Sequence, residues 1–258
     1  RKSKMARIVT SHSPGLSIVA TGSNSLQNLL VRASFFTAAG LFGGAALVVD
    51  AAGQGSLTNA SMSIENSTFF DITSFEQSSA LDINGGTTIV STVIKNSHFA
   101  SLSTHSAKRT AIDGRGVISV RAHQPVILLF NCTFRDIHLY GGYLTAIVYS
   151  DASPTLVLHN VIVTSVFFSS VLDGGIIIGV DDAQIVLRNT DISGITVEGM
   201  SSGDRFAAVQ QAGYQYRIQS SLFITNSSID VVSNVNGTQA LQVLSAIVSR
   251  AAIREGGG

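Results

Sequence analysis

The sequence predicts an all-β fold, a right-handed parallel β-helix that winds as a single-stranded solenoid of about seven coils with three strands per coil. Two observations lead to this prediction. One pattern recurs at steps of 29 to 37 residues along nearly the whole chain, and a repeat of this length is typical of solenoids. Within each repeat, apolar and polar residues alternate with a period of two, which indicates strands with one buried face.

The repeats are aligned on one position, called n, which holds asparagine in all repeats but the first. Position n holds Ala33, Asn66, Asn96, Asn131, Asn160, Asn189 and Asn226. Position n−4 holds Leu29, Met62, Thr92, Ile127, Leu156, Ile185 and Leu222. Position n−2 holds Val31, Ile64, Ile94, Leu129, Leu158, Leu187 and Ile224. Position n+3 holds Phe36, Phe69, Phe99, Phe134, Val163, Ile192 and Ile229, and position n+6 holds Ala39, Ile72, Leu102, Ile137, Val166, Ile195 and Val232.

The asparagine position is predicted to be a corner between two strands. The step from n−2 to n+3 is odd, so the alternation slips there and the chain must turn to keep both side chains inside. Asparagine suits this corner because it tolerates the left-handed region of backbone conformation. In stacked coils the amides of Asn66, Asn96, Asn131, Asn160, Asn189 and Asn226 are expected to form a hydrogen-bonded ladder, and the phenylalanines at n+3 to stack inside the core.

A second strand is expected before each n−4 strand, often with glycine at or before its start. The expected strands are Leu16–Ala20, Ala45–Val49, Leu81–Ile83, Val117–Val120, Ala146–Tyr149, Gly175–Val180, Ala207–Gln210 and Ser245–Ser249. With the n−4 strand and a short strand from n+3 to n+6, they complete three strands per coil.

This repeat resembles the right-handed β-helix families of the pectin-lyase-like superfamily over roughly residues 15 to 250. Gly43-Gly44-Ala45 followed by Asn66–Phe69 is similar to the G-G-A and F-x-x-N repeats of bacterial polymorphic outer-membrane proteins and autotransporter passengers. The resemblance implies an extracellular or cell-surface location. It also implies an enzymatic alternative, because related β-helices include pectate lyases and polygalacturonases.

The chain is interpreted as one β-helix domain over residues 15–253, with a basic flexible arm at 1–14 and a flexible tail at 254–258. Neither end shows an amphipathic helix that would cap the strand edges, so further β-helix coils are expected on either side. The uncharged run Ala33–Val49 fits the repeat, has three glycines, and is shorter than the roughly 20 apolar residues of a membrane span, so no transmembrane segment is expected. No secretion signal is visible, which also leaves an intracellular scaffold open.

Composition restricts the function classes. Lys+Arg and Asp+Glu number 16 each, so no overall field favours nucleic acid, and the absence of Trp argues against a common kind of sugar-stacking platform. The single cysteine, Cys132, excludes an intrachain disulfide and is read as a buried small side chain or a free thiol.

Catalytic and metal sites are not predicted. Asp181-Asp182 precedes Asn189-Thr190-Asp191, the reverse of the order in polygalacturonases, which these motifs otherwise resemble, and we expect the two aspartates to lie in a turn. Asp113 with Arg115 and Arg121 offers too few oxygen ligands for calcium. The six histidines show no metal-ligand spacing, and no phosphate loop or other cofactor motif is present.

Five N-x-S/T sequons occur, at Asn59, Asn66, Asn131, Asn226 and Asn236. Three of them belong to the corner, where a glycan would conflict with stacking. Asn59 and Asn236 fall in expected turns and are the candidate glycosylation sites.

The two longest steps place loops at 101–115 and 198–217, and insertions in solenoids often build the binding face. The candidate binding residues are Arg115, Tyr214, Tyr216 and Arg217 in these loops, and His123, which follows the first loop. We expect a non-catalytic segment of a larger surface or secreted protein, an elongated spacer or adhesion module with a polysaccharide or a cell-surface protein as partner. A polysaccharide lyase or glycoside hydrolase is the alternative.

Overall fold

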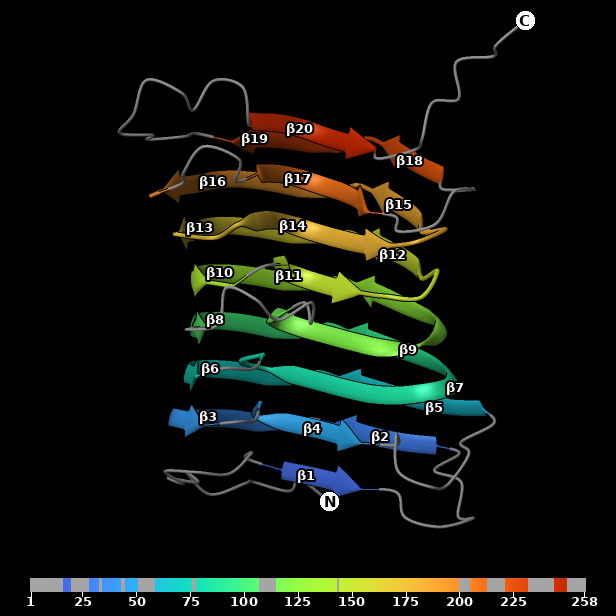
Figure 1. The fold of residues 1–258 in the computed structure, drawn as a ribbon. Helices are drawn as coiled ribbons and strands as arrows, with labels where there is room; N and C mark the ends of the chain where they lie inside the picture. The colour runs from blue at the N-terminus through green and yellow to red at the C-terminus, as the bar shows by residue number, and fades with distance from the viewer. Residues whose placement is uncertain are drawn as a thin grey trace, which may run out of the picture.

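The computed structural model of the protein describes residues 16–19, 28–32, 34–42, 45–50, 59–75, 78–106, 115–142, 144–199, 205–212, 221–231 and 244–249. Within these residues every regular element is a β-strand, and the paired strands run parallel. Figure 1 shows the strands stacked repeat upon repeat, from β1 near the N-terminus to β20 at the opposite end. The protein is therefore all-β, in an arrangement consistent with a β-solenoid.

The strands form three parallel ladders, each taking one strand or part of a strand from every repeat. The first ladder contains the strands that were expected before each n−4 strand, and all eight of these strands are present. In order, it is formed by β1 (Leu16–Val19), β4 (Leu47–Asp50), β7 (Leu81–Lys95), β9 (Arg115–Phe130), β11 (Leu144–Ser150), β14 (Asp173–Val180), β17 (Arg205–Ala212) and β20 (Leu244–Ser249).

The second ladder contains the n−4 strands. It is formed by β2 (Asn28–Arg32), β5 (Asn59–Glu65), the later parts of β7 and β9, β12 (Thr155–His159), β15 (Gln184–Arg188) and β18 (Ser221–Thr225). In β7 and β9 the two expected strands are thus one continuous strand. Strand β9 passes the junction through Gln124, whose φ of 45° bends the chain without ending the pairing.

The third ladder contains the strands that follow the asparagine. It is formed by β3 (Phe35–Phe42), β6 (Thr68–Phe75), β8 (His98–Ser106), β10 (Thr133–Gly141), β13 (Ile162–Ser169), β16 (Asp191–Glu198) and β19 (Ser228–Val231). All of them except β19 have eight or nine residues, more than the four expected from n+3 to n+6.

The predicted register is confirmed at n−4, n−2 and n+3 in every repeat. At n−2, for example, Ile94 pairs with Leu129, and Leu129 pairs with Leu158. The prediction at n+6 was wrong in the first and last repeats. Ile72 pairs with Ala38 instead of Ala39, and Ile195 pairs with Val231 instead of Val232, which lies outside the described residues.

The physical reason is a second corner at n+5, which the sequence reading missed. In the five middle repeats this position is left-handed, with φ between 52° and 64°, and this bend lets both n+3 and n+6 point inward. These residues are Asp71, Ser101, Asp136, Ser165 and Gly194. The first and last repeats have Ala38 and Val231 at n+5, side chains that disfavour positive φ, and there the register slips by one residue.

One apolar core runs through the repeats from Val31 to Val209. Its most regular part is the phenylalanine column at n+3, where Phe36, Phe69, Phe99 and Phe134 stack with ring centroids 4.6 to 4.8 Å apart and planes within 8°. The predicted stacking at n+3 is thus confirmed. A further buried column at n+8 was missed: Ser74, Thr104, Leu139, Phe168 and Val197.

Position n−4 departs from the apolar pattern at Thr92. Its side chain is fully buried between Met62 and Ile127, and its hydroxyl has no hydrogen-bond partner. The described part of the chain contains no helix of the length and apolarity needed to cross a membrane.

Candidate functional site

The corner at position n forms as the sequence requires. Asn66, Asn96, Asn131, Asn160, Asn189 and Asn226 all have φ between 48° and 53°. Side-chain amides are joined across neighbouring repeats: Asn131 donates to Asn96, Asn160 to Asn131 and Asn189 to Asn160, at 3.0 to 3.1 Å. These side chains are exposed, so the ladder lies on the surface.

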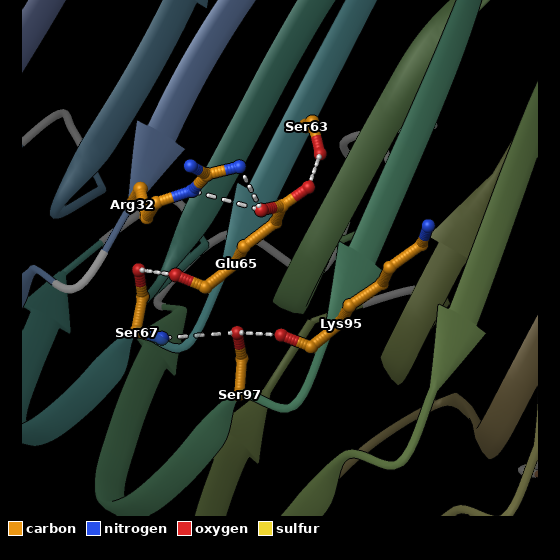
Figure 2. Close-up of polar contacts among 6 residues, drawn as sticks. All are labelled: Arg32, Ser63, Glu65, Ser67, Lys95 and Ser97. Carbon is orange, nitrogen blue, oxygen red and sulfur yellow. Dashed lines mark hydrogen bonds and ion pairs between the residues drawn. The ribbon is translucent and has the colours of Figure 1, made fainter.

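A column of hydroxyl groups follows the asparagines at n+1, on the buried side of the corner. Ser67 and Ser97 each donate to the carbonyl two residues earlier, at 3.0 and 2.9 Å, and the backbone N–H of Ser67 donates to the Ser97 hydroxyl at 3.3 Å (Figure 2). Thr190 and Ser227 repeat the arrangement. The asparagines at n thus form hydrogen bonds with one another, and the hydroxyl groups at n+1 form hydrogen bonds with backbone groups at the turn. We therefore interpret the corner as structural.

Cys132 takes the place of serine in this column. Its thiol is fully buried and lies 3.3 Å from the carbonyl oxygen of Phe130. Burial raises the pKa of the thiol to about 11. A thiol in this state is a poor nucleophile, which supports a packing role.

Charged side chains lie outside the corner at n−1. Arg32 donates two hydrogen bonds to the Glu65 carboxylate, at 2.7 and 3.0 Å, and Ser63 donates a third (Figure 2). The hydrogen bond from Arg32, followed by that from Ser63, lowers the pKa of Glu65. Because the pair is exposed to solvent, its contribution to stability is small.

The outer face of the first ladder contains a cluster of ionisable groups around Arg121. Arg121 on β9 forms an ion pair with the buried carboxylate of Asp82 on β7, at 3.0 Å. Asp151, which follows β11, interacts with Arg121 and with Asp181. Burial raises the pKa of Asp151 to about 6; Arg121 opposes this rise and Asp181 adds to it. A carboxyl group that titrates near pH 6 can act as an acid or a base.

The structure describes some of the charged residues that were weighed for catalysis or calcium binding. Asp181 and Asp182 lie half-buried between β14 and β15, in the expected turn, and Asp181 has a φ of 63°. Asp113 lies outside the described residues, and Arg121 pairs with Asp82, a residue 39 positions away. In the part of the chain that the structure describes, no three His, Cys, Asp or Glu side chains are grouped closely enough to hold a metal ion.

The candidate binding and glycosylation residues are only partly described. His123 is exposed on β9, and the backbone of Arg115 begins this strand. Tyr214, Tyr216, Arg217 and Asn236 lie outside the described residues. Asn59 is the first residue of β5 and not part of a turn. The predicted binding surface of the five residues therefore stays a prediction.

The structure brings together a different set of side chains on the outer face of the third ladder. Phe75, His105 and Tyr140 occupy the same position, n+9, on β6, β8 and β10. Their rings form a stack that we call the ring column, with centroids 5.2 Å apart between Phe75 and His105 and 4.5 Å between His105 and Tyr140. All three side chains are half-buried.

Two rings from position n+7 extend this column sideways. His138 donates to or accepts from the Tyr140 hydroxyl at 3.1 Å, and Phe167 on β13 lies 6.0 Å from the Tyr140 ring and 5.7 Å from His138. Burial, and secondarily the charge of His138, lowers the pKa of His105. The five rings form the ring cluster, a contiguous aromatic surface partly open to solvent. Clusters of aromatic rings with polar edges are typical of binding surfaces.

Sequence reasoning missed this cluster because it stopped at n+6. The signal was present: positions n+7 and n+9 face the same side as each other in an extended strand, and both hold rings in consecutive repeats.

Comparison of the chain with protein-family models, with curated proteins and with solved structures finds no match in any of the three. The resemblance to pectin-lyase-like β-helices therefore stays an inference from the repeat pattern.

Proposed function

We propose that the chain is a segment of a right-handed parallel β-helix, of about seven coils, in a larger surface or secreted protein. In this role it is a non-catalytic spacer and adhesion module that binds a glycan or a cell-surface protein. The supporting observation is the shared register of three columns: n−4, n−2 and n+3 pair from repeat to repeat through all seven repeats, and an apolar core runs from Val31 to Val209.

The register supports this role because each repeat pairs in register with the preceding repeat, which gives a rigid stack. Paired strands are about 4.8 Å apart, so the length of the module grows in proportion to the number of repeats. Handedness follows from the general rule that crossovers between parallel strands are right-handed in about 98% of cases. The ring cluster provides a surface on such a module where a partner can bind.

A second candidate function, a polysaccharide lyase or glycoside hydrolase of the pectin-lyase-like fold, is favoured by one observation. Asp151 has a pKa of about 6 and lies near Asp181 and Arg121 on the face of a parallel sheet. Glycoside hydrolysis uses two carboxyl groups in different protonation states, and burial is a common way to produce that difference.

One experiment separates the two functions. The protein is incubated at pH 5 to 8 with soluble polysaccharides, and new reducing ends and unsaturated products are measured alongside binding. The proposed function predicts binding to a polysaccharide or to intact cells without turnover. Turnover that is lost in Asp151→Asn would contradict it and support the enzyme. Binding neither to polysaccharides nor to cells would contradict the adhesion role.

A further inference from the structure

The ring column ends at Tyr140. In the next two repeats the same position holds Ser169, which pairs in register with Tyr140, and Glu198, which pairs in register with Ser169. Strands in a ladder are about 4.8 Å apart, close to the 4.5 Å between the rings of His105 and Tyr140. A ring placed over Ser169 would therefore continue the column at its existing spacing, against the face of Tyr140 that His105 does not cover.

The side chains around this place differ in chemistry. Phe167, on the same strand as Ser169, is inclined at 60° to Tyr140, with the two ring centroids 6.0 Å apart. Ser169 is half-buried and contributes a short side chain with a hydroxyl. Glu198, also half-buried, contributes a carboxylate one repeat further on. The place thus combines an apolar ring face, a second ring at its side and two polar groups that can accept hydrogen bonds.

We propose that Tyr140, Phe167, Ser169 and Glu198 form a subsite for one sugar ring of a neutral polysaccharide. A sugar ring has an apolar C–H face, which packs on Tyr140, and hydroxyls at its edge, which donate to the Glu198 carboxylate. The same carboxylate repels an acidic polysaccharide, because like charges at close range are unfavourable. This inference rests on the proposed adhesion function and specifies its ligand.

The decisive variant is Ser169→Phe, which puts a protein ring where the sugar ring would lie. Binding is measured by affinity electrophoresis in gels containing soluble glucan, mannan, galactan or xylan, with polygalacturonate as the acidic comparison. We expect the wild-type protein to be retarded by at least one neutral polysaccharide and much less by polygalacturonate. Ser169→Phe should weaken this binding about tenfold or more, with an unfolding midpoint equal to or above that of the wild type.

Three further variants keep the result interpretable. Tyr140→Ala removes the ring face and should weaken binding by a similar factor, whereas Glu198→Gln should reduce the preference for neutral over acidic polysaccharide. Ile162→Ala is the matched control, because Ile162 is 45% exposed on the same strand as Phe167 and outside the ring cluster. Its binding should equal that of the wild type.

Several outcomes would overturn the subsite. It is wrong if Ser169→Phe binds as tightly as the wild type, if polygalacturonate binds more tightly than every neutral polysaccharide, or if no neutral polysaccharide retards the protein. The first two outcomes leave the adhesion function standing. Polysaccharide turnover, or the absence of any cellular or glycan partner, would contradict the adhesion function itself.

Discussion

The side-chain amide of Asn160 donates a hydrogen bond to the side-chain carbonyl of Asn131, at 3.0 Å. Asn160 in turn accepts from Asn189, at 3.1 Å, and its backbone has a φ of 53°. One residue therefore provides both the ladder and the bend of the corner.

Replacing Asn160 separates these two contributions. In Asn160→Gly the bend is retained and the two ladder bonds are lost, which should lower the free energy of unfolding by about 1 kcal/mol. Asn160→Ala loses the bonds and also disfavours positive φ, so its loss should be larger, about 2 kcal/mol. Chemical denaturation of both variants measures the difference. Equal stability of the two would show that backbone strain makes no contribution.

Thr92→Val should stabilise the protein. The two side chains have nearly the same shape, and valine removes a buried hydroxyl that has no hydrogen-bond partner. The expected gain in the free energy of unfolding is about 1 kcal/mol. Thr104→Val is the matched comparison, because the Thr104 hydroxyl is buried but donates to the carbonyl of Gly116 at 3.1 Å. This variant should be neutral or destabilising, and a gain as large as that of Thr92→Val would contradict the explanation.

Stability should fall as pH rises through the titration of Asp151. Burial raises its pKa from an ordinary 3.8 to about 6, so the folded state binds the proton more tightly than the unfolded state. The contribution is fully present below about pH 4 and is lost as pH approaches and passes 6. Asp151→Asn should remove this dependence and be more stable than the wild type at pH 7, by about 1 to 2 kcal/mol.

The measurement is the unfolding midpoint of wild type and Asp151→Asn at pH values from 4 to 8. The difference between the two should be smallest at pH 4. A constant difference across this range would show that the carboxyl group does not titrate differently in the folded state.

Cys132 should resist thiol reagents while the protein is folded. The side chain is fully buried, and a thiol with a pKa of about 11 holds almost no thiolate at pH 8. A chromogenic disulfide reagent should therefore react fully with the thiol in denaturant. Without denaturant, the reaction should be only as fast as the local unfolding that exposes Cys132. Rapid stoichiometric reaction of the folded protein would contradict the position of Cys132 in the buried column.

Much of the fold could be predicted because the repeat acts through local alternation. Leu158 and Leu187 lie at equivalent positions, so the same rule that buries one buries the other. The n+5 corner was harder to see, because Asp71, Ser101 and Gly194 share only a tolerance of positive φ, which no single residue type reveals. In the last repeat Val231 stands at this position. The repeat pattern predicts that Val232 pairs with Ile195, but in the structure Val231 does.

Most of the candidate sites could not be predicted from the sequence, because their side chains meet only through the pairing of strands from different repeats. Asp82 and Arg121 are 39 residues apart and meet only because Asn84 pairs with Arg121. Likewise, Phe75, His105 and Tyr140 lie in three repeats of unequal length, and only the observed register brings their rings into one column.

The equal spacing of Asn131, Asn160 and Asn189, 29 residues in each case, has an evolutionary consequence. A duplicated 29-residue unit inserted at this point would meet, above and below, side chains of the same kind as those it was copied from. Such a duplication could add one repeat to the protein without any compensating substitution. This region is therefore where variants with different numbers of repeats would most readily arise.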